Sequence, residues 1–192
     1  MTGKIIGKTF FTADTHFGSE RALTLSRRPF DSVEEMDNEM VRRWNNMVGE
    51  NDTVIHLGDF GDLNARNRLN GKIILIQGNY EEELDPVEVR RALKETDVYI
   101  TGTEKEHATM ALKHNSCLYV LVHRPMDCNR GEDIDRSQIF NLFGHIHGRQ
   151  FVKKFGIDVG VDCNHFAPIT WETVEFYQNA IVKGYYDDNV FC

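Results

Sequence analysis

The chain has 192 residues, of which 41% are hydrophobic and 27% are charged, and its formal net charge is -8. This composition is typical of a globular domain, and no stretch approaches the ~20 apolar residues of a membrane span. The excess of acidic residues argues against binding of extended duplex nucleic acid, which requires clustered lysine and arginine. We therefore expect a cytoplasmic protein with neither a membrane nor a duplex partner, and self-association into a homo-oligomer stays open.

The four cysteines, at positions 117, 128, 163 and 192, form no C-x-x-C pair. Their spacing predicts free thiols rather than a disulfide framework. It also disfavours a zinc site built from thiolates.

The first half of the chain alternates predicted strands and helices. In chain order it is predicted to hold a strand at residues 8–13, a helix at 33–48, a strand at 54–57, a short helix at 64–69, a strand at 72–76, a helix at 85–94 and a strand at 98–101. The long helix has apolar residues at helical spacing, Ser32 before it and Gly49 after it. Residues 14–30 predict a loop.

The second half is dominated by predicted strands. In chain order it is predicted to hold a hairpin of residues 109–112 and 117–122, strands at 138–143 and 152–161, a helix at 168–179 and an irregular tail at 183–192. The helix should begin near Thr170, although Val174, Phe176 and Tyr177 also fit a strand. Together the halves favour an α/β or α+β fold with two packed sheets and outer helices, formed by a single domain of residues 1–192.

Side chains of metal-ligand type follow five of the predicted strands. They are Asp14 with His16, Asp59, Asn79, His123, and His145 with His147. Open α/β sheets bind ligands at the carboxyl ends of their strands, and alternate residues of an extended segment point to the same side. Imidazole combined with carboxylate and amide oxygen suits Mn, Fe, Zn or Ni. Seven such groups suit two ions that share one carboxylate.

The same motifs carry a family resemblance. In order they read Asp14-Thr15-His16, Gly58-Asp59, Gly78-Asn79-Tyr80-Glu81, His123 and Gly144-His145-Ile146-His147. This pattern resembles that of the calcineurin-like metallophosphoesterases, in particular compact bacterial, archaeal and phage members, over residues 9–165. The resemblance implies a two-sheet sandwich flanked by helices. It also implies one metal bound by Asp14, His16, Asp59 and His147, and a second bound by Asp59, Asn79, His123 and His145.

One position departs from the family pattern. Tyr80 stands where the family usually has a histidine beside the scissile phosphate. A tyrosine can donate a hydrogen bond there, but its ordinary pKa near ~10 makes it a weaker proton donor than imidazolium. Two arginines are candidates to hold the phosphate, because Arg124 follows a ligand and Arg149 follows the histidine pair.

The resemblance implies a binuclear metal-dependent phosphoesterase in which a hydroxide between the metals attacks phosphorus. The expected catalytic residues are Asp14, Asp59, Asn79, Tyr80 and His123. Phosphodiesters, either small molecules or nucleotides, are the expected substrates because Tyr80 is a weak proton donor. Mn²⁺ is the expected metal, with Ni²⁺, Fe²⁺ and Zn²⁺ as alternatives. Two other functions stay open, namely a phosphomonoesterase and a non-catalytic protein-interaction module on the same fold.

Overall fold

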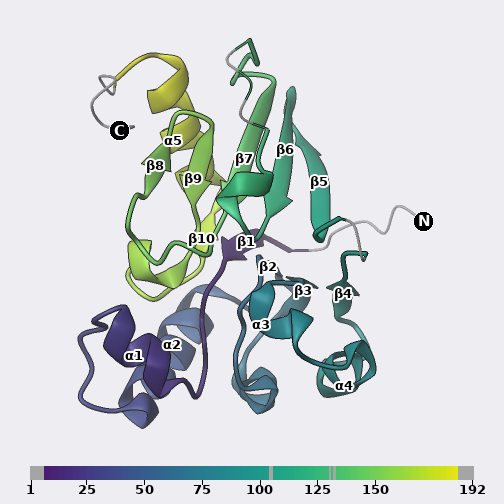
Figure 1. Cartoon of the computed structure of the whole chain (residues 1–192), viewed down its shortest axis with the longest axis vertical. Helices are drawn as coiled ribbons and strands as arrows, with labels where there is room; N and C mark the ends of the chain where they lie inside the picture. The colour runs from purple at the N-terminus through teal and green to yellow at the C-terminus, as the bar shows by residue number, and fades with distance from the viewer. Residues whose placement is uncertain (1–6, 104–105, 130, 132, 186–192) are drawn as a thin grey trace.

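Two five-stranded mixed sheets flanked by helices make up the protein, as the computed structural model in Figure 1 shows. The structure describes residues 7–103, 106–129, 131 and 133–185. The strand order is β10-β1-β2-β3-β4 in the first sheet and β5-β6-β7-β9-β8 in the second. Helices α1 to α4 lie on one side of the molecule, and α5 lies with the second sheet on the other side.

Most strands next to the candidate ligands run parallel. The first sheet contains β1 (Thr9–Thr12), β2 (Thr53–His56), β3 (Lys72–Ile76), β4 (Val98–Ile100) and β10 (Ile169–Thr170). The second contains β5 (Thr109–His114), β6 (Cys117–Val122), β7 (Ile139–Phe143), β8 (Val152–Lys153) and β9 (Gly156–Asp158). Strands β1 to β4 pair in parallel, as do β6, β7 and β9, while β10, β5 and β8 pair antiparallel at the edges.

The central strands are buried on both faces. On β1, Phe10 belongs to a cluster that includes residues of α2, whereas Phe11 belongs to a cluster shared by the two sheets. On β2, Val54 belongs to the first of these clusters and Ile55 belongs to the second. Because successive strand residues point to opposite faces, two buried faces require the continuous apolar runs seen in the sequence. The two sheets therefore pack face to face, with a helical layer behind the first.

The helical layer follows from the expected periodicity. The helices are α1 (Glu20–Leu25), α2 (Val33–Met47), α3 (Asn79–Glu82), α4 (Pro86–Ala92) and α5 (Trp171–Val182), with three 3₁₀ helices η1 (Leu63–Arg68), η2 (Pro125–Asp127) and η3 (Val161–Cys163). Helix α2 buries Met36, Met40 and Trp44, which are spaced four residues apart. The Ser32 hydroxyl caps it by accepting a hydrogen bond from the Glu35 amide at 3.1 Å.

The structure corrects several predicted elements. Helix α1 lies inside the predicted loop 14–30, because Ser19 caps a six-residue helix that buries only Ala22 and so leaves no apolar period. Helix α3 was missed because it is a single turn directly after β3. The predicted strand 152–161 is two short strands followed by η3, and the predicted helix 64–69 is the 3₁₀ helix η1.

The helix expected near Thr170 is confirmed. Thr170 is the cap of α5, and Val174 is buried in the core shared by the sheets. Beyond residue 185 the predicted tail lies outside the described residues. Cys117, Cys128 and Cys163 are free thiols as expected, and Cys192 lies in the undescribed segment. In the described part of the chain, no helix combines the length and hydropathy needed to cross a membrane.

Candidate metal centre

The seven candidate ligands lie just beyond the carboxyl ends of five strands and come together between the two sheets. Asp14 and His16 follow β1, Asp59 follows β2, Asn79 follows β3, His123 follows β6, and His145 and His147 follow β7. The two sheets are joined here, because the His145 amide donates to Asp14 Oδ2 at 2.8 Å. Parallel strands thus bring residues that are 131 positions apart into one site.

Two groups of donor atoms can each hold an ion. Asp14, His16 and His147 form the first group, and Asp59, His123 and His145 form the second, each with donor atoms within 4.8 Å of one another. In the first group, His16 Nε2 and His147 Nε2 are 3.3 Å apart.

The second group is completed by an amide oxygen. Asn79 Oδ1 lies 2.9 Å from both His123 Nε2 and His145 Nδ1, and these two nitrogens are 3.2 Å apart. Ligand atoms at metal distances of about 2.1 Å are about 3.0–3.4 Å from each other in octahedral and tetrahedral sites. The separation between His16 and His147, and those among Asn79, His123 and His145, therefore match the spacing of ligands around a single transition-metal ion.

Asp59 lies between the two groups. Its Oδ2 is 3.5 Å from His16 Nε2 in the first group and 3.4 Å from His123 Nε2 in the second. Its Oδ1 accepts a hydrogen bond from the Tyr80 amide at 2.9 Å, which fixes the plane of the carboxylate. The side chain is therefore positioned to serve both groups at once.

The site holds buried donor atoms that the protein itself does not satisfy. Asp14 is fully buried, yet its Oδ1 has no hydrogen-bond partner among the described residues. An unpartnered buried carboxylate oxygen is costly unless a cation lies next to it. The residues present therefore fit a pair of metal ions by position and by donor type. The buried Asp14 oxygen also fits, because a cation beside it would balance its charge.

Burial and neighbouring charges shift the pKa values of several candidate ligands. Burial raises the pKa of Asp14 above its usual range, because the charged carboxylate lacks solvent. Burial alone would lower the pKa of His123, but its hydrogen bond with Asp59 and the charges of Asp14 and Asp59 raise it to about 9. Asp14 and His123 therefore bind a proton more readily than usual, whereas burial lowers the pKa of His16 and His145 and keeps these imidazoles neutral.

Unusual backbone conformations are concentrated at the candidate ligands. Among the described residues, nine that are not glycine have positive φ, and five of these are Asp14, His16, Asp59, His145 and His147. Such conformations are uncommon for residues with a side chain, and they cluster at functional sites. The fold therefore tolerates local strain in order to aim these side chains.

The glycine before each of two ligands permits a close approach. A Cβ atom on Gly78 would lie 2.5 Å from Asp59 Oδ1, and one on Gly144 would lie 2.6 Å from Asp14 Oδ2. Any larger residue would displace a candidate ligand. This explains why glycine precedes Asn79 and His145.

In two of the candidate ligand histidines, a hydrogen-bond partner at Nδ1 orients the ring. His123 Nδ1 donates to the Leu57 carbonyl at 2.7 Å, and His147 Nδ1 lies 2.9 Å from Asp162 Oδ2. A carbonyl can only accept, so Nδ1 of His123 carries a proton and Nε2 is the nitrogen that would bind an ion. Burial opposes ionisation of Asp162, but hydrogen bonds from His147 and Arg28 outweigh it and lower its pKa. Asp162 therefore acts on His147 as an anionic acceptor.

Glu81 organises the loops that carry Asp59 and Asn79. It is buried, and its carboxylate accepts hydrogen bonds from the amides of Asp59, Phe60 and Gly78 at 2.8–2.9 Å. One side chain thus joins the end of β2 to the end of β3. This arrangement holds the second group together.

The structure separates the two predicted phosphate-binding arginines. Arg149 lines a cavity of about 610 Å³ together with Tyr80 and several candidate ligands. Arg124 does not line this cavity, because its guanidinium binds Glu82 at 2.8 Å and also contacts His107. The Tyr80 ring packs edge-on against His16 with 4.5 Å between the ring centres. Arg124 therefore lies outside the lining of this cavity, although its charge acts on His145, and its role in holding phosphate stays a prediction.

Sequence reasoning missed Asp162, Arg28 and Ser26 behind the first group. Arg28 is buried and binds Asp162 at 2.8 Å across 134 positions of sequence. Ser26 Oγ lies 3.1 Å from His147 Nδ1. Contacts between such distant residues leave no local pattern, and the loop that contains Ser26 and Arg28 was assigned no role.

No protein-family model matches the chain. The uncharacterized protein MJ1445 of Methanocaldococcus jannaschii is 24% identical over 189 residues, which cover 87% of this chain and 89% of that protein. The Gene 66 protein of Mycobacterium phage L5 is 32% identical over 85 residues, covering 40% of this chain and 41% of that protein. Both similarities are of sequence, and the name of neither protein states an activity.

A solved structure has a fold similar to that of this chain. The crystal structure of the protein of unknown function AQ665 from Aquifex aeolicus superposes with a TM-score of 0.67 and 19% identity, covering 89% of this chain and 99% of that one. YfcE, a phosphoesterase from E. coli, superposes over 80% of this chain and 78% of its own with a TM-score of 0.39 and 16% identity, which is too loose to support an argument. This chain therefore has a fold similar to that of AQ665, and its function has to be argued from the site itself.

Proposed function

We propose that this protein is a binuclear metal-dependent phosphoesterase of the calcineurin-like type that hydrolyses phosphodiesters. The observation that supports it most is the convergence of seven donor side chains into two groups with Asp59 between them. The matching order of the motifs along the chain adds to this support. Two-metal sites of this kind are a common solution for cleaving phosphoesters.

In this proposal, Asp14, His16, Asp59 and His147 hold the first ion, and Asp59, Asn79, His123 and His145 hold the second. When bound, the ions supply Lewis-acid charge to the phosphate oxygens and lower the pKa of bound water towards ~7. The donor set of four imidazoles, two carboxylates and one amide favours Mn²⁺, with Ni²⁺, Fe²⁺ and Zn²⁺ as alternatives.

The reaction adds one water across a P–O bond. The water oxygen ends on phosphorus, the P–O bond to the leaving group breaks, and the leaving alcohol or phenol takes up one proton. Tyr80 lines the cavity at the site, where its hydroxyl can donate a hydrogen bond to a substrate oxygen. Because phenol is a weak acid at neutral pH, Tyr80 assists good leaving groups better than poor ones.

Two alternatives compete with this proposal. A phosphomonoesterase would need efficient protonation of an alkoxide, which Tyr80 supports less well than an imidazolium would. A non-catalytic interaction module would have no need for strained backbone at five ligand positions. Both observations favour a phosphodiesterase.

Hydrolysis by the full chain tests the proposal. Bis(p-nitrophenyl) phosphate and p-nitrophenyl phosphate are compared in the presence of Mn²⁺ or Ni²⁺, alongside elemental analysis of the protein. We expect about two metal ions per chain and faster turnover of the diester. Absence of both bound transition metal and activity would refute the enzyme, while faster turnover of the monoester would favour the phosphomonoesterase.

A further inference from the structure

Three arginines line the cavity beside the candidate metal centre. Arg21 lies on α1, Arg27 lies just beyond the end of α1, and Arg149 follows the His147 segment. They share this cavity of about 610 Å³ with five candidate ligands. The arginines therefore come from two separate segments that the fold brings to one opening.

These three guanidinium groups have no partner among the residues that the structure describes. Within the part of the chain that the structure describes, most other arginines bind acceptors or stack on a ring, as Arg28, Arg42, Arg43, Arg66, Arg68, Arg90, Arg124 and Arg136 do. Four side chains, those of Arg21, Arg27, Arg91 and Arg149, have no hydrogen bond, ion pair or ring contact there. Three of these four line the same cavity.

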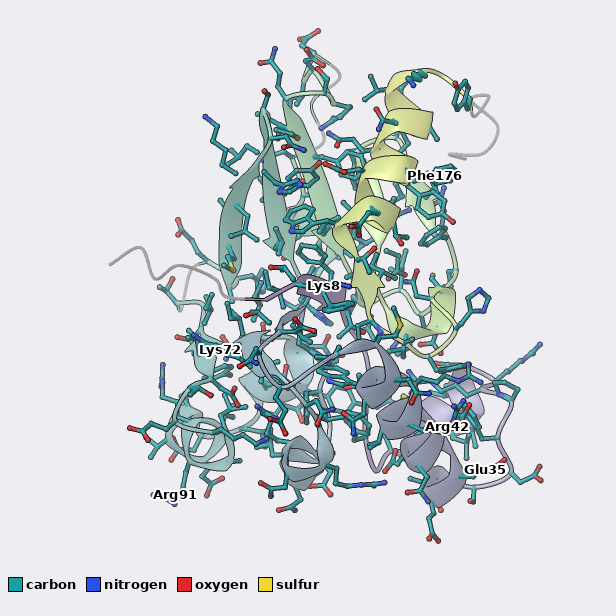
Figure 2. The ribbon with its side chains drawn as sticks, turned by 180° about the vertical axis from the view of Figure 1, so that it is seen from behind. Lys8, Glu35, Arg42, Lys72, Arg91 and Phe176 are labelled. Carbon is teal, nitrogen blue, oxygen red and sulfur yellow. The ribbon has the colours of Figure 1, made fainter. Side chains whose placement is uncertain are left out.

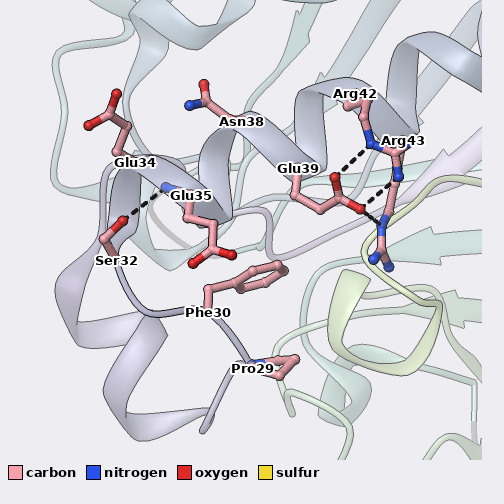
Figure 3. Close-up of a pocket in the computed structure, with 9 residues that line it drawn as sticks. All are labelled: Pro29, Phe30, Ser32, Glu34, Glu35, Asn38, Glu39, Arg42 and Arg43. Carbon is pink, nitrogen blue, oxygen red and sulfur yellow. Dashed lines mark hydrogen bonds and ion pairs between the residues drawn. The ribbon is translucent and has the colours of Figure 1, made fainter.

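Another hollow of the molecule shows the usual arrangement. A cavity of about 660 Å³ lies along α2, and both of its arginines, Arg42 and Arg43, bind the Glu39 carboxylate (Figure 3). Their charges are therefore neutralised locally. In the cavity at the metal centre, Glu83 is the sole carboxylate outside the ligand set, so three cations face one anion.

This local excess is notable in a chain with a net charge of -8. The scissile group of a phosphodiester carries a single negative charge, which the metal ions already offset. A terminal phosphate carries up to about two charges and binds guanidinium groups bidentately. The three arginines therefore exceed what the scissile diester alone requires.

We propose that Arg21, Arg27 and Arg149 form a subsite for a second phosphate group, so that the preferred substrates are small phosphodiesters bearing a further phosphate. This inference rests on the proposed function. Leu25 and Ile146 also line the cavity and offer apolar contact to the part of the substrate that links the two phosphates.

A matched pair of chromogenic substrates tests the subsite. Thymidine 5′-(p-nitrophenyl phosphate) and its 3′-phosphorylated form share one scissile diester and one leaving group, and they differ by a single phosphate. With Mn²⁺ present, we expect the 3′-phosphorylated form to show a KM about tenfold lower, equivalent to about 1.4 kcal/mol. The advantage should shrink in 0.5 M NaCl, because the arginines are exposed and salt screens them.

Single-charge variants locate the effect. Arg21→Gln and Arg27→Gln should each reduce the KM ratio of the two substrates and leave the KM for the simple diester nearly unchanged. Arg149→Gln should also reduce the ratio, but because Arg149 is a candidate to hold the scissile phosphate, its KM for the simple diester is measured as well. Arg91→Gln is the control, because Arg91 also lacks a partner among the described residues but lies on α4 (Figure 2) and does not line the cavity. It removes the same charge and should leave the ratio as in the wild type.

Failure of the inference can be told apart from failure of the proposed function. Hydrolysis of both substrates with equal KM, or an equal loss of the ratio in Arg91→Gln, would overturn the subsite alone. Hydrolysis of neither would overturn the phosphodiesterase. Calorimetric binding of thymidine 3′,5′-bisphosphate against thymidine 5′-monophosphate gives a second readout without turnover, and equal affinities would again overturn the subsite.

Discussion

At the residue scale, the orientation of the candidate ligands depends on neighbouring residues that contact them on the side away from the ions. Asp162 accepts from His147 Nδ1 at 2.9 Å and also binds the buried Arg28. Partners of this kind orient an imidazole and make its other nitrogen a better ligand, and losing them typically costs about 10–100-fold in metal affinity. The seven donors could be named from strand ends in the sequence. Asp162 could not, because its contact with Arg28 spans 134 positions.

The variant Asp162→Asn should weaken binding at the first group about 10–100-fold, because an amide holds the His147 ring less firmly than a carboxylate does. Calorimetric titration of the full chain with Mn²⁺ measures this. Asp133→Asn, at an exposed position, is the matched control and should bind as the wild type does. A folded Asp162→Asn protein that binds both ions with wild-type affinity would contradict the role given to Asp162.

His56 should make stability dependent on pH. It is fully buried, its Nε2 donates to Thr15 Oγ1 at 3.0 Å, and its Nδ1 is unpartnered. Burial lowers its pKa to about 3, so the unfolded chain, with a pKa near 6.5, binds the proton more readily. The contribution of His56 to the free energy of unfolding therefore falls as pH drops below 6.5, by about 1.4 kcal/mol per pH unit, and levels off near pH 3.

Urea unfolding at pH 5, 6, 7 and 8 measures this contribution. His56→Asn replaces the imidazole with a group that does not titrate. The wild-type free energy of unfolding should lose more between pH 7 and pH 5 than that of the variant. Parallel pH profiles for the two proteins would show that His56 does not carry this dependence.

At the scale of elements, strong local patterns were predictable and single turns were not. Helix α2 and strand β3 lie where periodicity and apolar runs predict them, because each buries a continuous face or stripe. Helices α1 and α3 are six and four residues long, too short to show a period. Both matter to the site, since α1 carries Arg21 and α3 begins with Asn79.

Glu81 in α3 links the ends of β2 and β3, and the variant Glu81→Gln tests this link. Its amide nitrogen would face one of three backbone donors, so we expect a loss of about 1–3 kcal/mol in the free energy of unfolding. Urea denaturation measures it, with the exposed Glu95→Gln as the control. Equal stability of the two variants would mean that the three hydrogen bonds do not hold the loops together.

At the scale of the whole molecule, the candidate metal centre lies where two sheets meet. Its ligands come from both sheets, so an ion bound there ties the two halves of the core together. Ligands that bind the folded chain alone add to its stability, by about 2.7 kcal/mol at a concentration 100 times the Kd. The parallel order of the strands was the part of the fold that allowed this site to be anticipated from sequence.

Mn²⁺ should therefore raise the melting temperature of the full chain, by about 5–10 °C at such saturation. Differential scanning calorimetry with Mn²⁺, and again after chelation with EDTA, measures the shift. Asp59→Asn should lose most of it, because Asp59 serves both groups, whereas Asp133→Asn should keep it. A wild-type melting temperature that does not respond to Mn²⁺, Ni²⁺ or Zn²⁺ would argue against a metal centre in the fold.

An anomalous-difference map from crystals grown with Mn²⁺ would show whether two ions bind at Asp59. We expect two peaks about 3.5–4 Å apart, both in contact with Asp59, one near His16 and His147 and the other near His123 and His145. A map with no peak at Asp59, or with ions bound elsewhere on the surface, would contradict this expectation.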